Sequence, residues 1–146
     1  MTTKTLVKEF MTRHPVTVSG STSVLDAWNL MIDRHIRRLP VVDGQRVVGI
    51  LSLGDLREAH ADSAEAPYGI RADVLMHDDP FTVTPDTTLR QAARIMLDKK
   101  VSGLPVVQDG VLIGIITESD LFRALIERET DATDPQPIGA VEGDAF

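Results

Sequence analysis

The chain has 146 residues, of which 42% are hydrophobic and 25% are charged, and its formal net charge is −7 at pH 7. This acidity argues against a protein that binds duplex DNA, because such a protein needs a basic face to release counterions. No apolar run approaches the roughly 18 residues that span a bilayer, and the first residues lack the apolar stretch of a secretory signal. Cysteine is absent, which excludes disulfides and thiolate metal sites. We therefore expect a cytoplasmic protein that binds neither nucleic acid duplexes nor membranes.

An internal repeat organises the sequence. Residues 11–59 align with residues 76–124 at a constant offset of 65 and without a gap, and 17 of these 49 pairs are identical. The identical residues form blocks, among them Leu39-Pro40-Val41-Val42, which matches Leu104-Pro105-Val106-Val107. Similarity kept in register over such a span indicates a duplicated structural unit.

The repeat also predicts the domain boundaries. Residues 5–60 form the first copy, residues 61–70 a linker of small and polar residues, and residues 71–128 the second copy. Residues 129–146 are acidic, contain prolines and glycines and lack apolar periodicity, so we expect a disordered tail there.

Both copies show the same order of expected elements. Small capping residues open the longer helices, and an Asp-Gly pair between two apolar runs predicts a β-hairpin. In chain order, the first copy is expected to contain a short helix (7–11), a strand (16–18), a helix opened at 21–23 and running to about 35, a strand (39–42), a strand (47–51) and a helix (53–59). The second copy is expected to contain the same elements at 72–76, 81–83, from 86–88 to about 100, 104–107, 111–116 and 118–126. The order after the short helix, β-α-β-β-α, predicts an α/β (α+β) fold.

The middle helix of each copy carries more apolar residues than one buried face needs. The apolar residues of each helix cover more than one face: Val24, Leu25, Ala27, Trp28, Leu30, Met31 and Ile32 in the first, and Leu89, Ala92, Ala93, Ile95, Met96 and Leu97 in the second. A helix that lies on one sheet requires an apolar stripe of only about 100°. The surplus favours contact with the other copy or with another chain, and we expect a homodimer. A helix sunk in a single core is the alternative.

Two segments, residues 41–55 and 103–120, resemble the paired motifs of cystathionine-β-synthase-type (CBS) domains. The resemblance extends from residue 7 to about residue 127. It implies two CBS repeats related by a pseudo-two-fold axis, an arrangement called a Bateman module. More narrowly, residues 10–13 and 36–40 are similar to the CBS pairs of bacterial acetoin-utilisation-type proteins.

The resemblance also implies ligand-binding residues. In the family, a segment of pattern Gly-apolar-apolar-Thr/Ser-x-x-Asp binds a nucleotide, with its Asp accepting hydrogen bonds from ribose hydroxyls and its Thr or Ser meeting a phosphate. A strand-to-helix junction suits an anion because free N–H groups point at it, and Gly114 lets a ligand or another backbone segment come close. The family completes each cleft with residues of the other copy. The first cleft would then contain Thr117, Asp120, Pro15, Val16, Arg37 and Arg38. The second would contain Ser52, Asp55, Pro80, Phe81, Ser102 and Gly103.

The two clefts are not expected to be equal. Arg37 and Arg38 give the first a cationic rim suited to phosphates, whereas Ser102 and Gly103 leave the second neutral. A second interpretation stays open, because Thr117-x-x-Asp120 and Ser52-x-x-Asp55 are also plausible helix N-caps, and capping and ligand contact can coexist. The arginines can equally form a solvated helix end.

We therefore predict a regulatory module rather than an enzyme. The sequence contains no Walker loop, no Gly-x-Ser-x-Gly elbow and no His-Glu-x-x-His pair, and its four histidines lack metal-ligand spacing. The expected ligand is AMP, ADP, ATP, NAD or S-adenosylmethionine, bound as a regulator and not as a catalytic cofactor. The expected readout is an unknown effector protein or the oligomer. A ligand-free dimerisation scaffold is the alternative function.

Overall fold

The computed structural model describes residues 4–62 and 69–128. The predicted acidic tail, residues 129–146, lies outside the described residues, as does most of the predicted linker. The helices and strands, in chain order, are η1 (Val7–Glu9), β1 (Thr12–Arg13), β2 (Val18–Ser19), α1 (Val24–Arg34), β3 (Arg38–Asp43), β4 (Arg46–Ser52), α2 (Leu53–Asp62), α3 (Ala72–Leu75), β5 (His77–Asp78), α4 (Leu89–Lys99), β6 (Gly103–Gln108), β7 (Val111–Thr117) and α5 (Glu118–Arg128).

The longer helices and the hairpins agree with the sequence prediction. Ser23 and Thr88 cap α1 and α4, each by accepting a hydrogen bond from the backbone N–H three residues later. In the second hairpin Asp109 and Gly110 both have positive φ angles, 52° and 79°. Two such residues between paired strands form the tight turn whose twist matches that of a β-hairpin.

The segments that begin each copy differ from the prediction. The expected strand over 16–18 is reduced to β2, Val18–Ser19, and the expected strand over 81–83 is reduced to one bridge between Val83 and Val106. Both follow a proline, which has no N–H to donate to a neighbouring strand. The expected helix over 7–11 is the single 3-10 turn η1, and α2 continues past residue 59 to Asp62.

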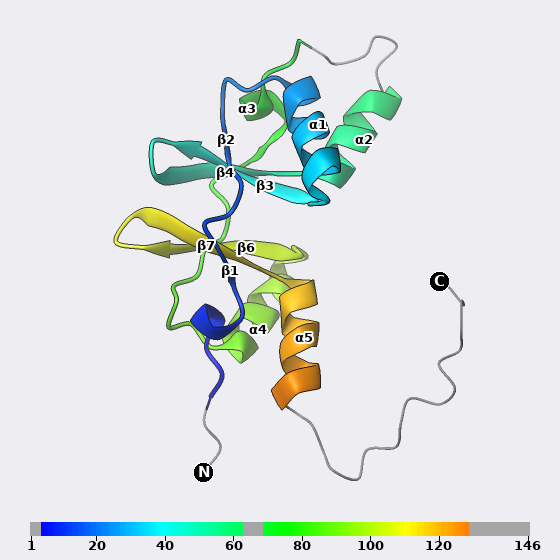
Figure 1. Cartoon of the computed structure of the whole chain (residues 1–146). Coiled ribbons are helices and arrows are strands. Elements are labelled where there is room, and N and C mark those ends of the chain that lie inside the picture. Colours follow the sequence, from blue (N-terminus) through cyan, green and yellow to red (C-terminus); the bar gives the residue numbers. More distant parts are fainter. Residues whose placement is uncertain (1–3, 63–68, 129–146) are drawn as a thin grey trace, which may run out of the picture.

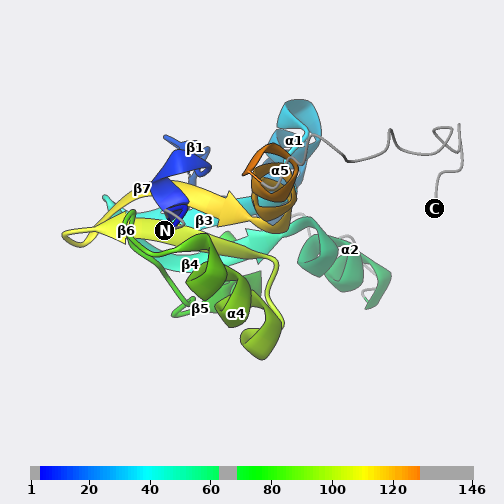
Figure 2. The ribbon, with the colours of Figure 1, turned by 90° about the horizontal axis from the view of Figure 1, so that it is seen from below.

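The strands form two sheets that face each other in the middle of the molecule. One sheet has the order β2-β3-β4-β5, and the other has the order β1-β7-β6. β4 and β7 are in contact where the sheets meet, and the Leu112 N–H donates to the Gln45 carbonyl at 2.9 Å near the hairpin turns. Figure 1 shows α1, α2 and α3 outside the first sheet and α4 and α5 outside the second. Seen from below, the two sheets overlap, and the helices lie toward the end opposite the hairpin turns (Figure 2).

The first residues of each copy pack into the half of the molecule whose sheet and helices come mainly from the other copy. β1 pairs antiparallel with β7 of the second copy, and β5 pairs antiparallel with β4 of the first. Val7 and Met11 are buried in the core of the second half, whereas Ala72 is buried in the core of the first. Each packed half therefore contains two separate pieces of chain, although the duplicated sequence unit is continuous.

Glycine makes this exchange sterically possible. A Cβ on Gly114 would lie 2.8 Å from the Thr12 carbonyl oxygen, and a Cβ on Gly49 would lie 3.0 Å from the His77 carbonyl oxygen. The first distance is one that real Cβ atoms essentially never show, and the second is tighter than most real Cβ contacts. The close approach expected at Gly114 is therefore made by the backbone of the other copy.

Candidate functional site

The strand-to-helix junction of the second copy combines Thr117, the last residue of β7, with Asp120 in the first turn of α5. The Asp120 carboxylate is only 3% exposed. Its Oδ2 accepts hydrogen bonds from the Thr117 N–H at 2.8 Å and from the Thr117 hydroxyl at 3.1 Å, and its Oδ1 accepts one from Arg123 at 3.1 Å. This carboxylate therefore caps the helix. Capping satisfies the buried charge without occupying every lone pair of its two oxygens.

The equivalent junction of the first copy is built by Ser52 and Asp55. The Ser52 N–H donates to Asp55 Oδ2 at 3.1 Å, and the Asp55 N–H donates to the Ser52 hydroxyl at 3.0 Å. This reciprocal pair is a capping box, in which two N–H groups at the helix start are satisfied at once. The second carboxylate oxygen lies 3.1 Å from Nε2 of His77, which comes from β5 of the other copy.

Arg38, the first residue of β3, reaches from the first sheet to the second. Its guanidinium Nη2 donates a hydrogen bond to the hydroxyl of Ser102. Its aliphatic stem covers Gly103, where a Cβ would lie 2.7 Å from Arg38 Cδ and 3.6 Å from Cγ2 of Thr117. The fold thus brings Arg38 and Thr117, both predicted for the first cleft, against the same glycine.

The charge of Arg38 is only partly balanced. Burial lowers the pKa of its guanidinium below the ordinary value, and the neighbouring cation Arg37 acts in the same direction. The carboxylate of Glu118 opposes these effects and raises the pKa of Arg38. A half-buried guanidinium whose hydrogen-bonding partner is a neutral hydroxyl favours the arrival of an anion, because charge-assisted hydrogen bonds are the stronger kind.

The remaining residues of the predicted first cleft are less closely joined. Arg37 is exposed, and its carbonyl accepts the Leu53 N–H of α2 at 2.8 Å. Pro15 and Val16 are half-buried, and Val16 packs against the core of the first half. Within the described parts of the chain, no hydrogen bond or ion pair joins Pro15 or Val16 to Thr117 or Asp120.

The predicted second cleft has a similar pattern. Ser102 and Gly103 contact Arg38, so residues assigned to different clefts meet at one place. Pro80 is half-buried, and Phe81 is 48% exposed, with the Lys99 ammonium 5.0 Å from the centre of its ring. Phe81 is therefore not a core aromatic.

Two features of this region had no signal in the sequence. His14 and Asp79, which directly precede Pro15 and Pro80, both have a φ of 50°. Such a φ is uncommon for residues other than glycine. It persists where the surrounding structure holds the backbone in a strained conformation. The contact of His77 with Asp55 is the second feature, because the partner strand β5 was not expected.

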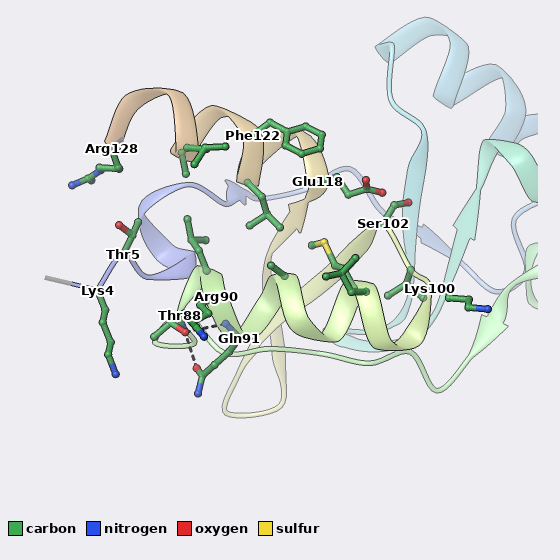
Figure 3. A pocket seen from close by; sticks show the side chains of 18 residues that line it. Lys4, Thr5, Thr88, Arg90, Gln91, Lys100, Ser102, Glu118, Phe122 and Arg128 are labelled. Atoms are coloured by element: carbon green, nitrogen blue, oxygen red, sulfur yellow. Dashed lines mark hydrogen bonds between the residues drawn. The ribbon is translucent and has the colours of Figure 1, made fainter. Parts of the chain in front are cut away.

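A groove of about 1110 Å³ lies elsewhere, between α4 and α5. Figure 3 shows Ser102 and Glu118 at one end of this groove and Thr88 and Gln91 at the other. Apolar side chains form much of its wall, and Leu97 and Phe122 are 74% and 60% exposed. Of the residues predicted for the clefts, only Ser102 lines the groove, and the apolar wall of the groove suits a protein surface better than a nucleotide.

Neither a metal centre nor a membrane-spanning helix occurs within residues 4–62 and 69–128. No group of three or more His, Asp or Glu side chains could hold a metal ion there. None of the helices in those ranges is both long and apolar enough to cross a membrane.

Comparison with known proteins gives a consistent assignment. The family model described as "CBS domain" matches residues 7–62 and again residues 70–127. An inosine-5'-monophosphate dehydrogenase from Korarchaeum cryptofilum is 37% identical over 116 residues, which are 79% of this chain but 23% of that protein. The chain thus spans about a quarter of the length of this curated relative, and 45% of the length of an uncharacterised relative from Methanocaldococcus jannaschii.

Three solved structures resemble the whole described fold. A Vibrio cholerae protein named for acetoin utilization (AcuB) has 34% identity and a TM-score of 0.75, covering 88% of this chain and 99% of its own. CBSX2 from Arabidopsis thaliana, in complex with AMP, has 34% identity and a TM-score of 0.73, covering 86% and 99%. The CBS domain pair of protein MJ0100, in complex with 5'-methylthioadenosine and S-adenosyl-L-methionine, has 28% identity and a TM-score of 0.78, covering 88% and 100%.

Proposed function

The chain belongs to the CBS domain family, and on that premise we propose that it is a regulatory module that binds an adenine nucleotide or a related adenosyl compound between its two repeats. CBSX2 and the MJ0100 pair were solved with AMP and with two adenosyl compounds. Both have the fold of this chain over more than four fifths of its length. The shared ligand chemistry is an adenosine group, with or without a phosphate.

One observation carries the proposal for this chain. Arg38 of the first copy and Thr117 of the second both lie against Gly103, and Thr117 is hydrogen-bonded to the buried Asp120. A cation and a hydroxyl for the phosphate and a carboxylate for the ribose are thereby supplied by residues of both copies. A ligand bound there touches both sheets and favours the relative orientation of the copies for which it has the higher affinity.

The regulatory readout lies in a partner protein or in the oligomer. Inosine-5'-monophosphate dehydrogenase is an enzyme of which this chain matches less than a quarter. The catalytic activity of that whole protein is therefore not transferred to the chain.

A thermal-shift panel with AMP, ADP, ATP, NAD, S-adenosylmethionine and adenosine tests this function. A ligand present at 100 times its dissociation constant stabilises the folded state by about 2.7 kcal/mol. Asp120→Asn keeps an oxygen for the helix cap but removes the charge, and is expected to weaken binding about tenfold or more. Asp98→Asn, the same change at an exposed site on α4, should leave binding unchanged. Absence of a shift with every compound at millimolar concentration contradicts the proposal.

A ligand-free dimerisation scaffold is the second candidate, because the α4–α5 groove exposes large apolar residues. Leu97 in α4 and the equivalent Ile32 in α1 both face solvent in the single chain. Apolar surface of this kind on two helix pairs favours burial against a second copy of the same module. Light scattering coupled to size exclusion should then give a mass of twice the 16.0 kDa chain. A dimer that binds no adenosyl compound would favour the scaffold over the sensor.

A further inference from the structure

Arg38 and Gly103 occupy equivalent positions in the two copies, since they are separated by the repeat offset of 65. They are also in contact, because the side chain of Arg38 fills the space in which a Cβ of residue 103 would lie. Equivalent residues of a two-fold pair can touch only near the axis that relates the two copies. Arg38 therefore lies on the pseudo-two-fold axis, where there is room for one long side chain and not for two.

The inner ends of the two proposed clefts meet at this axis. Arg38 is the ladder partner of Ser52 in the first sheet, and Gly103 is the ladder partner of Thr117 in the second. Ser52 and Thr117 are the hydroxyl residues proposed to meet phosphate. Arg38 is thus paired with Ser52 along its own sheet, while its side chain reaches the side of Gly103 on which Thr117 also lies.

The charges around the axis are unequal on the two sides. Arg37 precedes Arg38 in the first copy, whereas the equivalent of Arg37 in the second copy is the neutral Ser102. Glu118, at the start of α5, is an acid whose charge acts on Arg38. Two phosphates brought to the axis together would repel each other, and each would compete for the same guanidinium.

We propose that Arg38 is a single phosphate-binding cation shared by both clefts, so that the module holds one phosphorylated nucleoside together with one phosphate-free nucleoside better than it holds two phosphorylated ones. The inference rests on the proposed function, since it requires that both clefts bind nucleosides. It predicts that, when both clefts are occupied, one holds a phosphorylated nucleoside and the other a phosphate-free one. It also predicts that binding of one phosphorylated ligand weakens binding of a second.

Calorimetric titration of the full chain with AMP and with adenosine tests the shared cation. Asp55→Asn leaves the first cleft as the stronger site, and Asp120→Asn leaves the second. In each of these two backgrounds, adding Arg38→Ala is expected to weaken AMP about tenfold, the value of one charge-assisted hydrogen bond, and to change adenosine little. If the alanine variant folds poorly, Arg38→Gln replaces it. Gln can still donate a hydrogen bond to Ser102 but carries no charge, and it should give the same loss of AMP affinity. Arg46→Ala, an exposed arginine at the far end of β4, is the matched control.

A loss of AMP affinity in only one of the two backgrounds overturns the proposal, because Arg38 then belongs to a single cleft. Binding of nucleosides in only one cleft overturns it as well.

The coupling is measured with the unmodified chain. With the first equivalent of AMP bound, a second AMP is expected to bind at least about tenfold more weakly than adenosine does, because its phosphate finds no second guanidinium and is repelled by the phosphate already bound. Equal affinity for both, or tighter binding of the second AMP, contradicts sharing of the cation. If neither AMP nor adenosine binds the unmodified chain at all, the proposed function fails first, and this outcome is distinct from the others.

Discussion

Nε2 of His77 lies 3.1 Å from Oδ1 of Asp55, although the two residues belong to different copies of the repeat. In the other half of the molecule, Oδ1 of Asp120 is contacted instead by Arg123 of its own helix. The two carboxylates are equivalent in the sequence, yet their partners come from different elements and differ in chemistry. The residue equivalent to His77 in the first copy is Thr12, so the exchanged segments make the two clefts unequal in a second way, besides the placement of Arg38.

Removing the imidazole should make the second cleft more accessible to a ribose. We expect His77→Ala to strengthen adenosine binding severalfold in the Asp120→Asn background. In the unmodified chain a ribose hydroxyl must displace the hydrogen bond between His77 and Asp55 Oδ1, which is worth about 1 kcal/mol, and in the variant this bond is absent. Titration calorimetry measures the change, and His60→Ala, on the exposed side of α2, is the control. Weaker adenosine binding in the variant would mean that His77 itself contacts the ligand.

The contact of Arg38 with Gly103 predicts a non-additive pair of mutations. Gly103→Ala is expected to lower the free energy of unfolding by about 1–3 kcal/mol, because its Cβ would overlap the Arg38 stem. In an Arg38→Ala background the same substitution should cost much less, and a double-mutant cycle in urea measures the difference. Gly54→Ala in α2, whose Cβ would lie 3.8 Å from the hydroxyl oxygen of Ser52, is the control and should be neutral or stabilising. Equal costs in both backgrounds would argue against the overlap.

The exchanged segments predict that the two halves unfold together. Val7 is fully buried in the core of the second half, whereas Trp28, the single tryptophan, packs against the core of the first. Val7→Ala removes two buried methyl groups and should cost roughly 2 kcal/mol. The urea midpoint followed by Trp28 fluorescence should shift as far as the midpoint followed by circular dichroism. Val74→Ala, the same change at an exposed site, should have little effect. An unchanged fluorescence midpoint in Val7→Ala would show independent halves.

The α4–α5 groove predicts a variant that separates dimer from monomer. Leu97→Glu places a charge on the apolar wall, and the desolvation of that charge at an interface should shift a dimer to monomers in light-scattering measurements. Ile126→Glu changes another exposed apolar residue of α5 that does not line the groove, and should leave the mass unchanged. A chain that is monomeric before any substitution contradicts the dimer, and dissociation by both variants would place the interface beyond the groove.

Much of the fold could be predicted because its signals are local. Ser23 and Thr88 cap the helices they precede, and Asp109-Gly110 turns the hairpin, since each of these depends on the backbone conformation of a few neighbouring residues. The pairing of Thr117 with Asp120 is also local, because three residues at a helix start bring the two side chains together. Repetition at a constant offset then indicated a pair of units, and the family resemblance implied that a pseudo-two-fold axis relates them.

The sequence by itself determined that two copies of one unit exist, where most of their helices and hairpins lie, and which residues face each other within one turn. Only the tertiary structure decided that β1 and β5 complete the opposite halves, that His77 lies on Asp55, and that Arg38 lies on Gly103 at the axis between the copies. These contacts join residues far apart in the chain, and their free energy depends on how two separately formed surfaces fit together. No local pattern encodes that fit, because a two-residue strand or a single glycine gains its partner only when the two sheets have packed.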